Sequence, residues 1–180
     1  MLLGLVLLYV GAVLFCNGLW VLGRIGDREI TVINVFVGGL TLIAALFLAF
    51  GPGADANTIQ AAAYTLLFTF TYLWVAWNRW NGADGRGLGW FCFFVGVTVI
   101  PITLVSLGNA TSLWDWWFTL CWASWAILWL LFWALLALNK ENLAKFTGGL
   151  CALQGIYTGW IPGFMLLNGW IGPLAEAGGA

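Results

Sequence analysis

Four tryptophans in the second half of the chain are spaced so that their rings share one face of a helix. Trp122, Trp125, Trp129 and Trp133 are separated by three, four and four residues. At about 100° per residue, side chains with this spacing form one narrow stripe. Flat, uncharged rings can hold a planar, polar and uncharged solute between them. A single stripe can equally pack against other helices or lipid, so its meaning depends on what faces it.

Two other apolar segments carry stripes that can face these tryptophans. They follow the same three- and four-residue spacing, which keeps side chains on one helix face. The two sets are Leu7, Val10, Leu14 and Asn17, and Phe68 and Tyr72. If the three stripes converge, they enclose a narrow tube in which Tyr72, Asn17, Gln154 and the indole N–H groups replace the water that a solute loses. Ions are expected to be excluded, because the tube offers no fixed charge to replace their hydration.

The chain lacks the side chains that other activities inside a membrane require. It contains no His, and no carboxylate lies in the middle of an apolar segment. Intramembrane charges mark ion and proton paths, and the sequence has no nucleophile, phosphate-binding or metal-ligand motif. The cysteines, which show no C-x-x-C spacing, are Cys16, Cys92, Cys121 and Cys151. We therefore expect no enzyme activity, no metal and no cofactor.

The composition indicates which elements must position the stripes. Charged residues make up 7% of the chain and apolar residues 63%, whereas soluble domains carry about 25% charged residues. With six Lys and Arg and a net charge of -1, the chain lacks the clustered basic residues that binding a nucleic acid requires. Each apolar run is long enough to cross about 30 Å of hydrocarbon as a helix. The fold class expected is an all-α membrane protein forming a single domain over 1–180, with spans at 2–22, 31–51, 60–79, 88–107, 115–138 and 146–168.

The basic residues predict how these spans are oriented. Every Lys and Arg follows an odd-numbered span, as Arg24 and Arg28, Arg79 and Arg86, and Lys140 and Lys145. The other loops, and the tail after Asn168, carry acidic charges or none. Because basic loops stay in the cytoplasm, both termini are expected outside a bacterial inner membrane.

A recurring string suggests an internal repeat. Each even-numbered span contains a related sequence, at Phe36 to Leu40, Phe94 to Val97 and Phe146 to Leu150. Each odd-numbered span has an Asn towards its cytoplasmic end, at Asn17, Asn78 and Asn139. Three helical hairpins inserted in the same orientation around a central axis would account for both patterns.

Several strings, in order along the chain, resemble the AmiS/UreI family of urea and short-chain amide channels. They are Gly4 to Gly11, Asn17-Gly18, Asn34 to Leu40, Phe70 to Leu73, Ile100-Pro101, Asp115 to Trp117, Lys145 to Thr147 and Trp160 to Pro162. The resemblance implies a homohexamer of six-helix protomers, each built from three hairpins around its own pore. It implies an outer constriction at Leu7, Leu14 and Phe68, and an inner one at Tyr72, Trp125, Leu128 and Trp129. It also places Trp122 and Asn17 along the path.

Two departures from the acid-gated members of the family affect the expected function. Those members carry long, His-containing outer loops, whereas the loops at 51–60 and 107–114 are short here and the chain has no His. Gln154 stands where the acid-gated urea channels have a Glu. Both point to the amidase-associated branch and to a passive channel without acid activation, whose permeants are acetamide-like amides and urea and which supplies a cytoplasmic amidase or urease.

Two other functions remain open at this point. One is secondary transport of amides coupled to ions, which the lack of intramembrane charges argues against. The other is a membrane partner that only anchors a soluble enzyme through its short basic loops.

Overall fold

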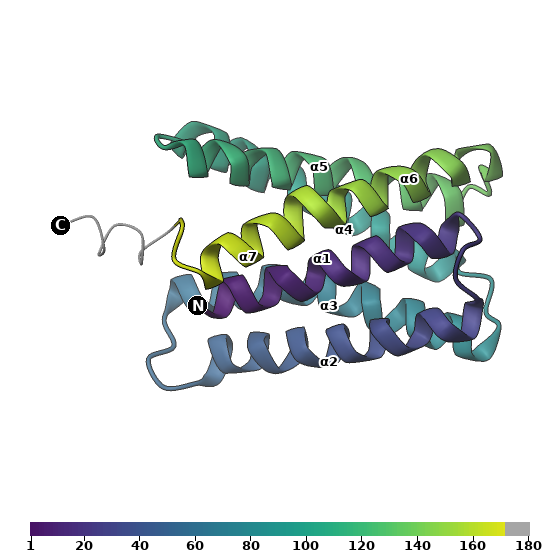
Figure 1. Cartoon of the computed structure of the whole chain (residues 1–180), viewed down its shortest axis with the longest axis horizontal. Coiled ribbons are helices and arrows are strands. Elements are labelled where there is room, and N and C mark those ends of the chain that lie inside the picture. The colour runs from purple at the N-terminus through teal and green to yellow at the C-terminus, as the bar shows by residue number, and fades with distance from the viewer. Residues whose placement is uncertain (172–180) are drawn as a thin grey trace.

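The computed structural model describes residues 1–171, which form a bundle of membrane-length helical segments without a strand (Figure 1). Six segments have the length and apolar composition to cross a membrane, so the prediction of six long apolar helices is confirmed. The first five are α1 (Leu2–Val21), α2 (Asp27–Phe50), α3 (Ala56–Asn81), α4 (Arg86–Asn109) and α5 (Leu113–Leu136). The sixth span is composite, with η1 (Glu141–Leu143), α6 (Ala144–Gln154), the π-helix η2 (Gly155–Trp160) and α7 (Ile161–Leu167).

Several helices extend beyond the predicted spans because loop residues cap them. Asp55 accepts a hydrogen bond from the Thr58 backbone N–H at 2.8 Å, and the Thr58 hydroxyl accepts one from the Asp55 N–H at 2.8 Å. Ser112 and Asp115 form the same reciprocal cap at the start of α5. Such a cap satisfies backbone donors that the first helical turn leaves free. The helix therefore begins in the polar residues that the hydrophobic pattern assigns to a loop.

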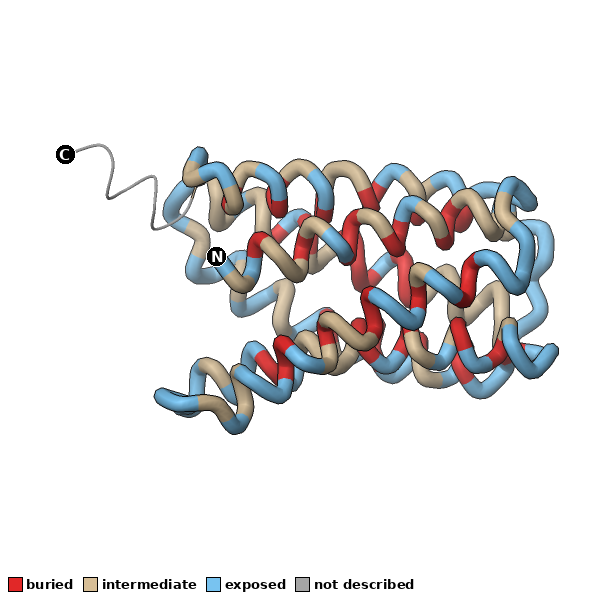
Figure 2. Tube along the Cα trace, turned by 60° about the horizontal axis from the view of Figure 1, so that its bottom comes forward, coloured by how far each residue is buried: buried red, intermediate tan, exposed pale blue. Residues whose placement is uncertain are grey.

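The helices pack in a ring in which neighbours along the chain alternate between close and loose contact. α2 packs most extensively against α3, α4 against α5, and α1 against the sixth span, whereas α1 and α2, α3 and α4, and α5 and α6 touch less. Buried positions recur along the sides where the helices face one another (Figure 2). Each even-numbered span thus packs against the odd-numbered span of the next hairpin, and the sixth span closes the ring on α1.

The repeated string occupies equivalent environments in the three hairpins. Its phenylalanines, Phe36, Phe94 and Phe146, are exposed by 68%, 58% and 61%. The residues that follow them, Val37, Val95 and Thr147, are exposed by 1%, 0% and 0%. The first glycines, Gly38, Gly96 and Gly148, lie against Leu73 of α3, Leu130 of α5 and Leu22 at the end of α1. These matching positions support the three-hairpin repeat.

The Asn pattern holds for only two of the three hairpins. Asn17 and Asn78 are buried inside α1 and α3. Asn139 is exposed and lies beyond the end of α5, with a φ of 53°. Asn tolerates this left-handed conformation better than most residues, so it serves the turn rather than the helix.

Glycines allow α1 and the sixth span to approach until their backbones touch. Gly4, Gly11 and Gly18 recur every seven residues on α1 and face glycines of the sixth span. A methyl group on Gly11 would lie 2.6 Å from the Gly155 carbonyl oxygen and would also overlap the backbone of Gly159. Small residues give this kind of contact between membrane helices, where lipid supplies no hydrophobic drive.

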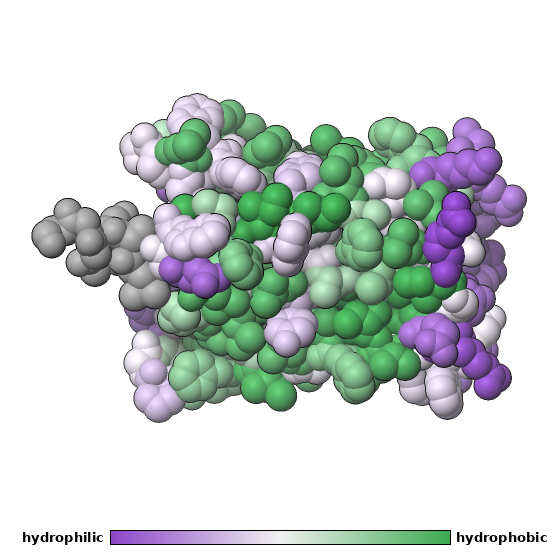
Figure 3. All heavy atoms as spheres, in the orientation of Figure 1, coloured by the Kyte–Doolittle hydropathy of each residue, from purple (hydrophilic) through white to green (hydrophobic). Residues whose placement is uncertain are grey.

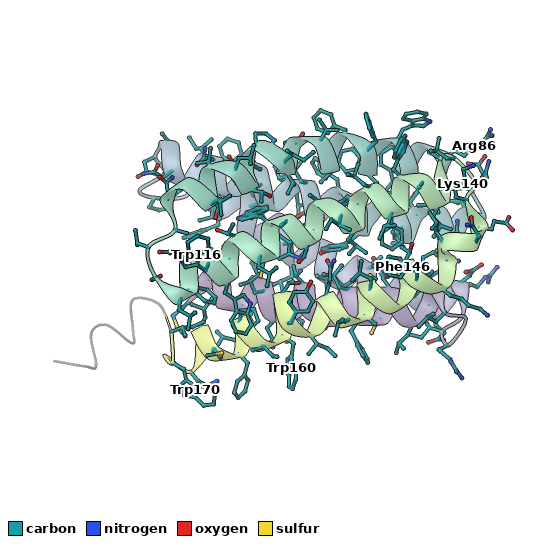
Figure 4. All side chains as sticks on the ribbon, turned by 90° about the horizontal axis from the view of Figure 1, so that it is seen from above. Arg86, Trp116, Lys140, Phe146, Trp160 and Trp170 are labelled. Atoms are coloured by element: carbon teal, nitrogen blue, oxygen red, sulfur yellow. The ribbon has the colours of Figure 1, made fainter. Side chains whose placement is uncertain are left out.

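Most of the charged residues gather at one end of the bundle. Figure 3 shows a hydrophobic middle band and a cluster of hydrophilic residues at the end formed by the α1–α2, α3–α4 and α5–α6 connections. Arg86 and Lys140 lie at this end, opposite Trp116 and Trp170 (Figure 4). We call it the basic end, because all six Lys and Arg lie in or beside these connections. The C-terminus, with Glu176, lies outside the described residues.

Candidate functional site

Two cavities lie inside the ring, between α1, α3 and α5. The wide cavity has a volume of about 250 Å³ and is lined by residues from the first half of α1, including Leu3 and Val6, and by Tyr64 of α3. The narrow cavity has a volume of about 60 Å³ and reaches towards the basic end, where Arg79 and Gly85 line it. The two cavities follow one another along the helices.

Ten of the eleven predicted lining residues line one or both cavities. Those that line the wide cavity alone are Leu7, Val10 and Trp122. Those that line the narrow cavity alone are Leu14, Asn17, Tyr72, Leu128 and Trp129. Phe68 and Trp125 line both. Gln154 lines neither.

Phe68 and Trp125 form the partition between the cavities. The Phe68 ring lies 4.9 Å from the Trp125 ring at 83° and 4.5 Å from the Trp129 ring at 66°. Trp122 extends the cluster, with its ring 5.1 Å from Trp125 at 90°. Edge-to-face packing of this kind stabilises aromatic pairs beyond the area that they bury. The stripes on α3 and α5 therefore meet around an uncharged aromatic barrier.

The last tryptophan of the stripe does not join this barrier. Trp133 packs against α4, with its ring 4.7 Å from Phe93 and 6.0 Å from Trp90. The stripe therefore faces the interior only as far as Trp129.

The expectation that indole N–H groups face the tube is wrong for Trp125. Its Nε1 donates to the Thr158 hydroxyl at 2.9 Å, and that hydroxyl donates to the Gln154 carbonyl at 2.6 Å. Trp117 likewise donates to the Tyr157 carbonyl at 3.0 Å. Both acceptors lie in the π-helix η2, whose altered bonding pattern distinguishes it from an α-helix. These bonds fix the orientation of the Trp125 ring and leave only its apolar surface for the cavities.

Gln154 holds α5 and the sixth span together. Its Nε2 donates to the Ser124 carbonyl at 2.9 Å, and the side chain is 1% exposed. The Tyr157 hydroxyl bonds to the Ser124 hydroxyl at 2.8 Å in the same interface. Although α-helical spacing does not exclude Gln154 from the tube, these contacts turn it towards α5.

Tyr72 lines the narrow cavity, with its hydroxyl enclosed by the surrounding side chains. Its hydroxyl is buried and has no hydrogen-bond partner among the described residues. Asn17, by contrast, is paired with Asn34, with N···O distances of 3.1 and 2.6 Å in the two directions. Since an unpaired buried hydroxyl is costly, a polar solute that reached the Tyr72 hydroxyl would recover that energy.

The narrow cavity has further lining residues that the sequence reasoning missed. They are Trp20, Thr71, Val75, Asn78, Arg79, Gly85, Leu88, Cys92, Phe132, Leu136 and Cys151. Val75, Asn78 and Arg79 continue the Phe68 and Tyr72 stripe at intervals of three or four residues, so extending the stripe to the end of α3 would have found them.

Arg79 is the one charged residue among those lining the two cavities. Its Nη1 lies 3.9 Å from an Asp27 carboxylate oxygen, and its guanidinium carbon lies 5.4 Å from the centre of the Trp20 ring. Trp20 Nε1 donates to the same carboxylate at 2.7 Å. These contacts anchor the charge at the mouth of the cavity, and the partition itself stays uncharged.

The comparisons with known proteins agree with this architecture. Residues 2–170 match the AmiS/UreI family of transporters. The chain is 40% identical over 176 residues to a protein of Mycolicibacterium smegmatis named for the transport of amidate substrates, covering 97% of this chain and 81% of that protein. It is 35% identical over 198 residues to the acid-activated urea channel of Helicobacter pylori, covering 94% of this chain and 100% of that protein.

The fold agrees with a solved structure as well. The crystal structure of the urea channel from Helicobacter pylori superposes with a TM-score of 0.81 at 36% identity, covering 93% of this chain and 97% of that one. Relatives and structural neighbours are transporters and channels rather than enzymes. The chain therefore belongs to the AmiS/UreI family of transporters and is a multi-pass membrane protein.

Proposed function

We propose that the chain is a passive channel for small neutral amides, namely acetamide-like short-chain amides and urea, with its pathway inside one subunit. The observation that carries this proposal is the uncharged aromatic partition between two cavities that follow one another along the bundle. Planar amides fit between such rings, and Tyr72, whose hydroxyl has no partner among the described residues, lies beside them. The names of the relatives, an amidate transporter and a urea channel, support the same substrate class.

The proposed pathway passes from the wide cavity to the narrow cavity through the partition. Its lining consists of Leu7, Val10, Leu14, Asn17, Phe68, Tyr72, Trp122, Trp125, Leu128 and Trp129. An ion at the partition would lose its hydration with nothing to replace it. The absence of carboxylates from the lining of either cavity favours passive diffusion over ion-coupled transport.

Flux measurements on the purified protein test this function. In stopped-flow experiments, proteoliposomes should take up urea and acetamide faster than protein-free liposomes, with no dependence on Na⁺ or proton gradients. Uptake that stops when ion gradients are dissipated would favour the coupled transporter. Uptake no faster than in empty liposomes would favour the enzyme-anchoring alternative.

We further propose that the channel is not acid-gated. The chain has no His, and His is the side chain that ordinarily titrates between about pH 5 and 8. Asp55 caps α3, and the hydrogen bond from the Thr58 backbone N–H lowers the pKa of its carboxyl below the usual 3.8. A lowered pKa keeps this carboxylate ionised, and the cap intact, until the pH falls well below that window.

The expected result is an equal urea flux at external pH values of about 7.5 and 5, with the internal pH held constant. The paired measurement uses the same proteoliposomes in both external buffers. A several-fold rise at the lower pH would contradict the absence of acid activation and would leave the amide pathway itself unaffected.

The cellular setting that we propose follows from the charge distribution. The basic end faces the cytoplasm of a bacterium, so both termini lie outside its inner membrane. Six protomers assemble into a homohexamer, as the family resemblance implies. The permeating amide is consumed by a cytoplasmic amidase or urease, which keeps its gradient inward.

A further inference from the structure

The bundle contains a reciprocal pair of carboxamides beside the narrow cavity. Asn17 Nδ2 donates to Asn34 Oδ1 at 3.1 Å, and Asn34 Nδ2 donates to Asn17 Oδ1 at 2.6 Å. The two side chains are exposed by 6% and 0%. Each carboxamide thus uses one N–H and its carbonyl oxygen at once, which is how any two primary amides can pair.

In the second hairpin, which contains Asn78, one member of this carboxamide pair is missing. Like Asn17, Asn78 lies in the last turns of the first helix of its hairpin. Asn34 stands two residues before the repeated Phe36, and the same position before Phe94 is Cys92. The second hairpin therefore has a thiol where the first has the partner carboxamide.

The Asn78 side chain is buried, yet none of the described residues forms a hydrogen bond with its amide. The residue is 4% exposed and lines the narrow cavity, together with Cys92. Unlike the Tyr72 hydroxyl, its amide atoms are not among the sealed, unpartnered groups of the described interior. A buried carboxamide left in this way needs a partner that comes from the cavity.

The neighbouring polar groups at this end of the cavity are already engaged. The Arg79 guanidinium lies beside Asp27 and donates to the Ala83 carbonyl at 2.8 Å. The Trp20 N–H is bonded to Asp27, and Asn17 is held by Asn34. Asn78 is thus the carboxamide at this end that no described residue engages.

We infer that Asn78 is a specificity-determining residue that binds the permeating amide, which takes the place that Asn34 holds beside Asn17. This inference rests on the proposed amide channel. Primary amides and urea carry a carbonyl oxygen and an N–H on the same side of the molecule, so they can complete the reciprocal pair. Glycerol has hydroxyl groups only and cannot present this arrangement.

The test is the permeability of proteoliposomes to urea, acetamide and glycerol for the wild type and Asn78→Leu. Losing one or two neutral hydrogen bonds is expected to lower the acetamide-to-glycerol and urea-to-glycerol permeability ratios by about five-fold. Asn78→Gln keeps the carboxamide and should restore part of the ratio. The matched control is Asn81→Leu, because Asn81 is exposed on the same helix and bonds only to the Trp77 carbonyl.

The outcomes separate this inference from the function on which it rests. If the wild type conducts no amide, the proposed function fails. If the wild type conducts amides and Asn78→Leu keeps its ratios, the channel stands and the role of Asn78 is overturned. If Asn78→Leu does not fold, unchanged ratios in Asn78→Gln and Asn78→Ser together would overturn it as well.

Discussion

Replacing Gly11 with alanine is expected to destabilise the folded bundle by about 3 kcal/mol. The added methyl group would lie 2.6 Å from the Gly155 carbonyl oxygen and would overlap the backbone of Gly159 and Trp160. Backbone atoms cannot turn aside as a flexible side chain can, so α1 and the sixth span must separate. The measurement is thermal unfolding in detergent, monitored as the fraction of protein that remains monodisperse at each temperature.

Gly39→Ala provides the matched control for this change. Gly39 also lies inside a helix, yet a methyl group there meets no atom within 4 Å. Because alanine is the better helix former, this variant should be as stable as the wild type or gain about 0.5 kcal/mol. Equal stability of the Gly11 and Gly39 variants would contradict the close contact between α1 and the sixth span.

Phe68→Ala is expected to abolish size selection while the protein still folds. Phe68 lines both cavities and packs against Trp125 and Trp129. Removing its ring would join the wide and narrow cavities, so glycerol and longer amides such as butyramide should permeate several-fold faster. The loss of packing should cost about 3 kcal/mol of stability. Stopped-flow uptake of a size series, with unfolding measured in parallel, gives both quantities.

Phe50→Ala separates the partition from the general effect of deleting a phenyl ring. Phe50 is 82% exposed at the end of α2, so its removal should leave the size series unchanged. If Phe68→Ala also kept the wild-type size series, the partition would not be the barrier, and the proposed pathway would have to lie elsewhere.

The sequence is informative about the bundle because its signals are strong and local. Long apolar runs need helices in lipid, where every backbone polar group must be satisfied internally. The spacing of Phe68, Trp125 and Trp129 predicts which faces turn inward, and the structure brings these three rings together. Basic residues gather at one end because every one of them lies in or beside a connection that follows an odd-numbered span, and these connections share that end (Figure 3).

The features that sequence reasoning missed depend on contacts between distant segments. No local pattern shows that η2 is a π-helix or that Thr158 accepts the Trp125 N–H. Gln154 turns towards Ser124 only because α5 and α6 pack together there. The contact between Asn17 and Asn34, and hence the unpaired Asn78, needs the helices to be placed first.

The closure of the ring between its first and last members sets the order of assembly. Among the six spans α1 is synthesised before the others, yet its most extensive contacts are with the sixth span, which follows them. Until then, the glycine-lined side of α1 has no matching surface. The two cavities can be enclosed only when the sixth span has been synthesised. A nascent chain of five spans therefore carries every aromatic ring of the partition but lacks the helix that completes the ring around it.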